Sequence, residues 1–215
     1  MTGAEWNDDL MRAGVFPAVQ ARSRVMRDRL IAEGLVIARK IPFDDISIID
    51  ICTAANCSIG AFYARFPDKL TLFKGIMVAA AAESAPLLEG VVRDNAFPDI
   101  LSRLTQAQVE RFREQEIFFR SAFKVSLDAS EAWEPFRRNS HALAGAFIAR
   151  ALAEYSSDAA GVDEARIRFG FQIMYGVLNN AVMNRPGPYL LESEDFAPML
   201  EQAMRAVMAL PSKGE

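Results

Sequence analysis

Few side chains in this sequence could carry out metal-dependent or nucleophilic chemistry. The 215 residues include a single histidine, His141, and two cysteines, Cys52 and Cys57, which could bind a metal only together with further ligands. One histidine also argues against a histidine-based catalytic site. Nucleophile-elbow, P-loop and dinucleotide-binding glycine patterns do not occur, and Arg138 stands where a Glu-x-x-His di-iron motif would need glutamate. We therefore predict that the chain is not an enzyme and uses neither a cofactor nor a metal.

Two serines in the first third of the chain suit a different chemistry, the binding of an anion by a helical module. Ser47 is a good N-cap for a short helix from about Ile48 to Ala55, because its hydroxyl can accept a hydrogen bond from an unpaired backbone N–H. Asn56 tolerates the left-handed backbone of a tight turn, and Ser58 can cap a further helix that runs to about Phe66. This order of elements predicts a helix-turn-helix, whose second helix can lie in the major groove of DNA.

The segment from Ser47 to Lys69 resembles the DNA-binding signature of bacterial regulators of the TetR/AcrR type. In that signature a Ser/Thr-capped helix with an Asp-Ile pair leads into Ala-Gly-Val-Ser, then into Gly-x-(aromatic or aliphatic)-Tyr-x-x-Phe and a downstream lysine. A preceding helix of the right length is expected from about Ala18 to Lys40, so the resemblance covers about residues 22–75. The matching residues are Asp50-Ile51, Ala55, Ser58, Gly60, Phe62-Tyr63, Phe66 and Lys69.

The resemblance implies a role in DNA binding for individual residues. Ser47, Tyr63 and Lys69 stand where the family contacts backbone phosphates, which fix register without reading sequence. Further phosphate contacts are expected from the start of the preceding helix, at Arg22, Arg24 and Arg27. The positions expected to face the bases are Ser58, Ile59, Gly60, Ala61, Ala64 and Arg65.

The segment departs from the family pattern in three ways. Asn56 replaces the usual turn glycine, and Pro42 stands where the family commonly has glycine after the first helix. The base-reading positions are unusually apolar, since they include Ile59, Ala61 and Ala64. We expect sequence readout to depend on contacts with thymine methyl groups, on the guanidinium at position 65, and on DNA shape. The alternative interpretation of the whole segment is a helical hairpin in the core of a bundle.

Apolar residues recur at helical spacing along most of the chain, and no period-2 strand pattern is evident. We predict an all-α fold with a three-helix DNA-binding domain at residues 18–74, preceded by a flexible arm at residues 1–17. A larger helical bundle for ligand binding and dimerisation should occupy residues 75–215. Its helices are expected at roughly 98–116, 117–128, 132–155, 163–184 and 193–210.

The composition and the charge distribution agree with a globular protein that has one segment suited to binding a polyanion. Hydrophobic residues make up 51% of the chain, enough for a substantial core. Apolar runs are too short to span a bilayer, and the N-terminus lacks a signal-peptide pattern, so we expect a cytoplasmic location and no membrane contact. Residues 18–74 hold nine Lys/Arg against six acids, whereas residues 75–215 hold fourteen against nineteen. A basic segment joined to an acidic body suits DNA binding, although chance would explain this excess equally well.

Two helices near the C-terminus carry apolar stripes at three- and four-residue spacing. The resemblance implies that this pair docks against the same pair of a second subunit as a four-helix bundle. Such a homodimer would hold its two helix-turn-helix modules, here called the reading heads, about one DNA turn, roughly 34–36 Å, apart. A stripe of this kind can also be core within one chain. The residues expected at the dimer interface are Phe171, Met174, Leu178, Met199, Leu200, Ala203, Met204 and Val207.

Aromatic residues are concentrated in the middle helices, where they could line an apolar pocket for a hydrophobic effector or simply form a packed core. The resemblance suggests a repressor that such a small molecule releases from its operator by favouring another spacing of the two heads. The alternative is a TetR-like scaffold that does not bind an operator and works as a ligand-binding or protein-interaction module. The candidate pocket residues are Phe112, Phe119, Phe123, Trp133, Phe136, His141, Phe171 and Tyr175.

Overall fold

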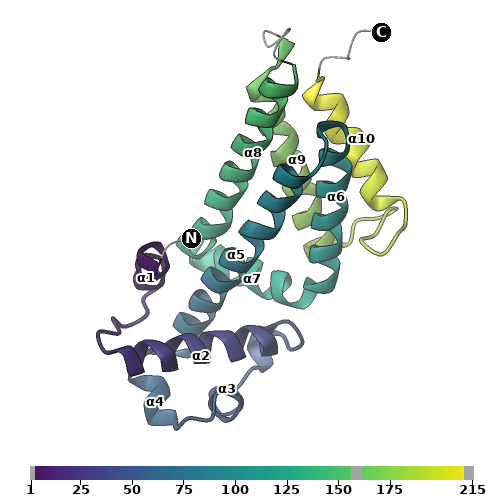
Figure 1. The fold of residues 1–215 in the computed structure, drawn as a ribbon. Coiled ribbons are helices and arrows are strands. Elements are labelled where there is room, and N and C mark those ends of the chain that lie inside the picture. Colours follow the sequence, from purple (N-terminus) through teal and green to yellow (C-terminus); the bar gives the residue numbers. More distant parts are fainter. Residues whose placement is uncertain (1–2, 156–160, 211–215) are drawn as a thin grey trace. The chain divides into compact units, whose positions relative to one another are not determined.

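The computed structural model describes residues 3–155 and 161–210, which are helical and contain no strand (Figure 1). This confirms the predicted all-α fold. The α-helices are α1 (Gly3–Arg12), α2 (Ala21–Ala38), α3 (Ile48–Ala54), α4 (Ile59–Tyr63), α5 (Lys69–Asp94), α6 (Phe97–Glu114), α7 (Glu116–Asp128), α8 (Glu134–Glu154), α9 (Glu164–Asn184) and α10 (Phe196–Met208). Two short 3-10 helices, η1 (Phe43–Asp45) and η2 (Ser130–Trp133), precede α3 and α8.

The chain forms two compact units. The first unit comprises Met1–Ser84 and Glu116–Phe136, and the second comprises Ala85–Gln115 and Arg137–Glu215. Helix α5 continues without a break past residue 74, where the sequence suggested a domain boundary, and α7 belongs to the same unit as α2, α3 and α4. The division of labour between a DNA-binding part and a ligand-binding and dimerisation part remains a prediction.

The N-terminal segment differs from the loose arm that we expected for residues 1–17. Residues Gly3–Arg12 form α1, and Leu10 and Val15 are buried. The Trp6 indole N–H donates a hydrogen bond to a carboxylate oxygen of Asp28 on α2, at 3.3 Å. The expectation was wrong because the helix is short and rich in acids, so its few buried positions do not stand out in the sequence.

The first half of α5 forms the centre of the first unit. Leu72, Phe73, Ile76 and Met77 are almost completely buried. By length and composition α5 is the one helix in the described ranges that could cross a membrane, but half of its apolar window is buried inside the protein. Burial in a protein core therefore accounts for its apolar composition.

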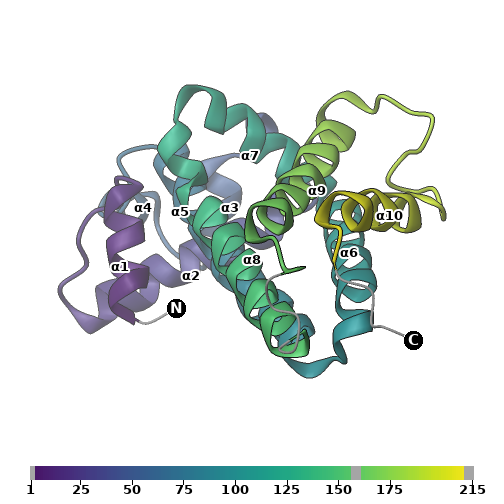
Figure 2. The same ribbon diagram turned by 90° about the horizontal axis from the view of Figure 1, so that it is seen from above.

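The second unit contains a packed layer of α6, α9 and α10, which Figure 2 shows side by side. This packing contradicts part of the predicted dimer interface, because five of its residues already lie in the core of one chain. The stripes mark the face turned toward the nearest apolar partner, and here that partner is intramolecular. The five buried residues are Phe171, Met174, Leu178, Leu200 and Met204, whereas Met199 and Ala203 are exposed and Val207 is half-buried.

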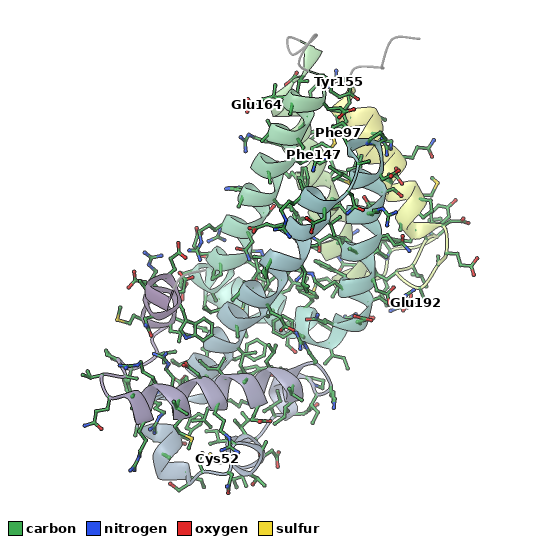
Figure 3. The ribbon with its side chains drawn as sticks, viewed as in Figure 1. Cys52, Phe97, Phe147, Tyr155, Glu164 and Glu192 are labelled. Atoms are coloured by element: carbon green, nitrogen blue, oxygen red, sulfur yellow. The ribbon has the colours of Figure 1, made fainter. Side chains whose placement is uncertain are left out.

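Aromatic side chains add a second feature to this unit. The ring of Phe97 lies 5.4 Å from that of Phe147 and 5.5 Å from that of Tyr155, measured between centroids (Figure 3). Phe147 in turn meets Phe171 edge-on at 5.6 Å. Phe171, expected both in a pocket and at a dimer interface, is therefore a packed core residue.

Helices α2 and α5 approach each other closely at Gly34. A Cβ atom at this position would lie 2.6 Å from Cδ1 and 3.3 Å from Cγ1 of Ile76. Glycine is therefore required here for packing rather than for an unusual backbone angle.

Replacing Gly34 by valine should overpack this contact and lower the free energy of unfolding by about 2 kcal/mol. Urea denaturation monitored by circular dichroism would measure the loss. The control is Gly145→Val on α8, where an added Cβ meets no atom within 4 Å, so stability should change by no more than about 0.5 kcal/mol. Equal stability of the two variants would contradict the close α2–α5 contact.

Candidate nucleic-acid interface

Helices α3 and α4 form a helix-turn-helix with both of the predicted caps. The Ser47 hydroxyl accepts a hydrogen bond from the Asp50 backbone N–H at 3.0 Å, and the Ser58 hydroxyl accepts one from the Ala61 N–H at 3.1 Å. Between the helices, Asn56 adopts the left-handed conformation, with φ of +49°. These local interactions define where each helix starts and how the chain turns between them. Helix α4 ends at Tyr63, earlier than the expected Phe66.

Helix α4 has one buried and one exposed face. Phe62 is fully buried and packs against the ring of Phe66, with centroids 5.5 Å apart. On the other face the side chains of Ile59 and Tyr63 are 47% and 50% exposed, and Gly60 and Ala64 are exposed as well. An exposed short helix held by a buried aromatic pair has the shape needed to enter a DNA groove, and its surface is apolar except for the Tyr63 hydroxyl.

Lys69 does not point toward this exposed face. Its ammonium group donates hydrogen bonds to the carbonyl oxygens of Phe43 at 2.9 Å, Asp44 at 3.3 Å and Ile46 at 2.9 Å. The same group lies 4.6 Å from the centroid of the Phe43 ring. An ammonium has three N–H donors, and all three are used by backbone carbonyls. This geometry argues against the phosphate contact expected for Lys69 and gives it the role of fixing η1 ahead of α3.

Arg65 also holds the module together. Its Nε donates to the Ser23 carbonyl at 3.2 Å and its Nη1 to the Ala61 carbonyl at 2.6 Å, so the guanidinium joins the end of α4 to the start of α2. The Arg65 carbonyl accepts a hydrogen bond from the Phe16 N–H at 3.0 Å. The side chain is therefore committed to the protein, contrary to the expectation that it reads bases.

The arginines of α2 divide into buried and exposed positions. Arg27 is only 3% exposed, and its guanidinium pairs with Asp28 at 2.8 Å, so it cannot reach a phosphate in this conformation. Arg24 donates to the carbonyls of Ala18, at 3.4 Å, and Val19, but it is exposed. Arg22 is exposed as well, so the start of α2 still presents positive charge.

The two cysteines lie within the helix-turn-helix, and both are free thiols. Figure 3 marks Cys52, which is buried on α3. Burial raises its pKa to about 11, and the negative charge and hydrogen bonding of Cys57 add to the effect. Cys52 is therefore a protonated core thiol at neutral pH rather than a nucleophile.

The residues expected to line an effector pocket do not form one group. Phe119, Phe123, Trp133 and Phe136 form a chain of ring contacts in the first unit, with centroids 4.6 to 6.2 Å apart. The others, Phe112, His141, Phe171 and Tyr175, belong to the second unit.

The second unit contains buried polar groups near Tyr175. The Tyr175 hydroxyl accepts a hydrogen bond from Gln108 Nε2 at 2.7 Å, and burial raises the tyrosine pKa. Four residues further along α9, the buried Oδ1 atom of Asn179 has no hydrogen-bond partner in the described parts of the chain. A buried acceptor without a partner costs free energy, which a bound donor would recover.

Comparison with known proteins identifies the fold. No family model and no curated protein matches the sequence. Solved structures do match, with TM-scores of 0.61 for each of three examples. GusR of Salmonella enterica is 16% identical, and the match covers 86% of this chain and 95% of GusR. A TetR-family regulator from Mesorhizobium loti is 15% identical, over 88% and 96%. RolR, solved with its ligand resorcinol, is 18% identical, over 88% and 90%.

The chain thus has the fold of the TetR-family transcriptional regulators. At identities of 15% to 18%, TM-scores of 0.61 over most of the chain establish the fold alone, and a shared fold does not by itself give the function.

The role of Lys69 can be tested by its effect on stability. Lys69→Ala removes three charge-assisted hydrogen bonds and should lower the free energy of unfolding by about 2 kcal/mol. Lys69→Arg keeps the charge but cannot aim three donors at one point, so it should recover only part of this loss. Lys40→Ala, at an exposed position, is the control and should cost at most about 0.5 kcal/mol. If denaturation shows equal losses for Lys69→Ala and Lys40→Ala, the ammonium does not fix η1.

Proposed function

We propose that this protein is a TetR-type transcriptional regulator that binds operator DNA as a homodimer in the bacterial cytoplasm. The observation that carries the proposal is the capped helix-turn-helix, with an exposed α4, within a TetR-type fold. The simplest mode of action is that of a repressor that a small, largely hydrophobic effector releases from DNA.

The proposed DNA contacts come from the exposed part of the module. Tyr63 would contact a phosphate through its hydroxyl, with Arg24 and Arg22 adding positive charge at the start of α2. Ser47 would contact one only by giving up the hydrogen bond that its hydroxyl donates to an Asp50 carboxylate oxygen at 2.6 Å. Helix α4 would face the bases through its apolar surface, where contact with thymine methyl groups and DNA shape supply specificity. The base-facing positions are Ser58, Ile59, Gly60, Ala61 and Ala64.

A mobility-shift assay with the DNA that flanks the protein's own gene tests this proposal. Ile59→Glu places a carboxylate among the phosphates and should weaken binding more than about 10-fold, whereas Tyr63→Phe should weaken it about 3- to 10-fold. Leu127→Glu adds the same charge at an 80% exposed position on α7 and should leave binding unchanged. Affinity should fall steeply with salt concentration.

The same assay decides between the two candidate functions. The apolar surface of α4 is the feature that favours a scaffold without operator binding. Equal retardation by the wild type and Ile59→Glu would mean that α4 does not face DNA. No retardation of any fragment would favour the ligand-binding or protein-interaction module.

The proposed dimer uses the outer faces of α9 and α10, which lie next to the buried stripes on each helix. Phe169 and Val177 are half-exposed on α9, and Met199 is half-exposed on α10. Gly176 and Ala203 are exposed small residues on the same two helices and permit close approach of a second subunit. These exposed apolar and small side chains are of the kind expected in a helical dimer interface.

Ala203→Asp should therefore convert the dimer to a monomer, because it places an unpaired charge in the interface. Size-exclusion chromatography with light scattering would show the change of mass, and DNA affinity should fall about 100-fold or more because one head alone contacts half a site. Leu87→Asp, at an exposed apolar position on α5, should remain dimeric. A dimer that survives Ala203→Asp would place the interface elsewhere.

The effector would bind in the second unit beside Tyr175, Gln108 and Asn179. RolR, which shares the fold, was solved with the small phenolic ligand resorcinol. In this chain the surrounding core is apolar, and the unpaired Asn179 oxygen favours a ligand that carries one hydrogen-bond donor. His141 is exposed and is not needed for this site.

A further inference from the structure

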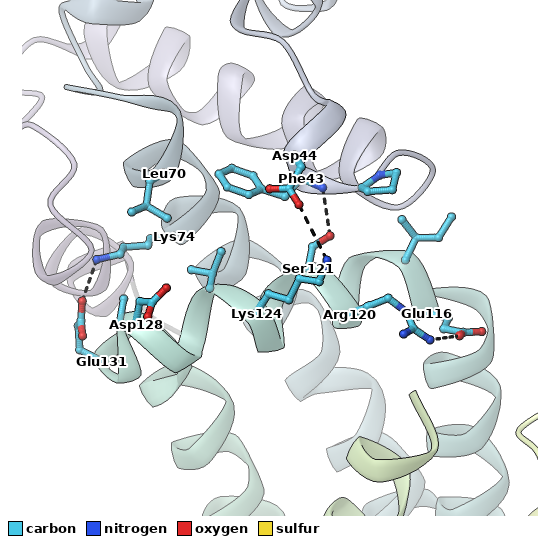
Figure 4. A pocket seen from close by; sticks show the side chains of 14 residues that line it. Phe43, Asp44, Leu70, Lys74, Glu116, Arg120, Ser121, Lys124, Asp128 and Glu131 are labelled. Atoms are coloured by element: carbon cyan, nitrogen blue, oxygen red, sulfur yellow. Dashed lines mark hydrogen bonds and ion pairs between the residues drawn. The ribbon is translucent and has the colours of Figure 1, made fainter. Parts of the chain in front are cut away.

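A cavity of about 590 Å³ lies within the first unit, beside the helix-turn-helix (Figure 4). Its walls come from η1 and Pro42, from the start of α5, from α7, and from the beginning of η2. None of the residues beside Tyr175 and Asn179 lines it. The volume is in the range of small-molecule binding sites, and the lining is mixed apolar and charged.

The apolar part of the lining comes from several elements. Phe43 lies on the η1 side, Leu70 lies on α5, and Ile117 and Val125 lie on α7. Leu70 and Ile117 are 40% and 38% exposed. A ligand that covered them would remove apolar surface from water.

The charged part of the lining is asymmetric. Lys74 pairs with Glu131 at 2.8 Å, and Arg120 pairs with Glu116 at 2.9 Å. Lys124 approaches Asp44 at only 3.9 Å, and both side chains are largely exposed. Figure 4 shows Lys74, Glu131 and Asp128 at one end of the cavity and Arg120 and Glu116 at the other.

The side chain of Asp128, the last residue of α7, forms no hydrogen bond or ion pair with any described residue. It is exposed, and Lys124, four positions earlier on α7, lies 3.9 Å from Asp44. The carbonyl end of a helix adds partial negative charge at this place. The end of the cavity with Asp128, Glu131 and Lys74 therefore carries a net negative charge.

We propose that this cavity is a second small-molecule site, which takes an elongated amphipathic molecule with an apolar body and a cationic amine. The body lies along Phe43, Leu70, Ile117 and Val125, and the ammonium group faces Asp128. The binding claim stands on the cavity alone, whereas its effect on DNA rests on the proposed function.

The position of the cavity gives such a ligand a direct route to the reading head. The Phe43 N–H donates a hydrogen bond to the Ser121 hydroxyl of α7 at 3.1 Å, across the cavity wall. The carbonyls of Phe43, Asp44 and Ile46 are those held by Lys69, and Ser47, the cap of α3, follows at once. A molecule that separates η1 from α7 would therefore act on the segment that positions α3.

Three matched probes test the site: phenylbutylamine, phenylbutanol and phenylbutyrate, titrated into the full-length protein by isothermal calorimetry. The amine should bind about fivefold more tightly than the alcohol, and the acid more weakly than both. Asp128→Asn should remove the advantage of the amine and leave the alcohol unaffected. Equal binding of amine and acid, or no change with Asp128→Asn, would overturn the proposed charge selectivity.

Blocking variants locate the probes. Leu70→Trp and Ile117→Trp fill the cavity from partly exposed positions at different walls and should each abolish binding of the amine. Leu127→Trp, on α7 but outside the lining, should bind as the wild type does. Circular dichroism confirms folding of each variant. Binding that survives both blocking variants, or no binding of any probe to the wild type, would refute the site.

The effect on DNA is measured separately. If the protein retards operator DNA, saturating phenylbutylamine should weaken that affinity in the wild type and in Leu127→Trp but not in Leu70→Trp. A protein that binds the amine but no DNA would contradict the proposed regulator and leave the site standing. Amine binding without any change in DNA affinity would overturn the coupling.

Discussion

The segment that leads into the helix-turn-helix is held by one charged group, the half-buried Lys69 ammonium, which donates hydrogen bonds to three carbonyls that precede α3. Those carbonyls belong to η1 and to Ile46, where the chain changes direction and leaves its N–H and C=O groups unpaired by regular helix. An unpaired backbone carbonyl away from water is costly, and a lysine satisfies three at once. These hydrogen bonds fix the segment that leads into α3, whereas the cap at Ser47 and the turn to α4 are set by local interactions.

Two further cations of the module also serve the protein's own structure. Arg65 joins α4 to α2, and Arg27 is buried with Asp28. Together with Lys69, three of the nine Lys/Arg residues at positions 18–74 are held by the protein itself, so the charge count of this segment overstates the charge that its surface presents. Arg22, Arg24, Arg29 and Lys40 remain exposed.

The sequence was sufficient to predict the features that depend on local interactions. The caps at Ser47 and Ser58 and the left-handed turn at Asn56 each involve residues no more than a few positions apart, and all three are present. The hydrogen-bond partners of Lys69 and Arg65 could not be predicted, because Lys69 binds carbonyls 23 to 26 positions away and Arg65 binds the Ser23 carbonyl 42 positions away. A lysine or arginine next to a helix-turn-helix looks the same in the sequence whether its side chain binds a phosphate or a backbone carbonyl.

The apolar stripes of α9 and α10 show a related limit of prediction from sequence. A stripe of apolar residues on a helix predicts burial but does not say which partner covers it. On α9 and α10 the strongest stripe is covered by the same chain, and small and half-exposed residues remain on the outer faces, which is why the proposed interface uses those faces. Cavities are harder still to predict from the sequence, because their walls come from segments that lie far apart in the chain.

The cavity beside η1 lies between a strongly held and a weakly held side of this segment. Three hydrogen bonds from one ammonium group hold η1 on one side, while the hydrogen bond from Phe43 to Ser121 and the long Lys124–Asp44 ion pair join it to α7 on the other. A molecule that enters between them meets the weaker of the two attachments first. The strong attachment then carries the displacement to α3 as a unit instead of absorbing it, because η1 and the cap of α3 are continuous in the chain. If a small ligand enters the cavity as proposed, it would therefore shift η1 and the cap of α3 together without unfolding them.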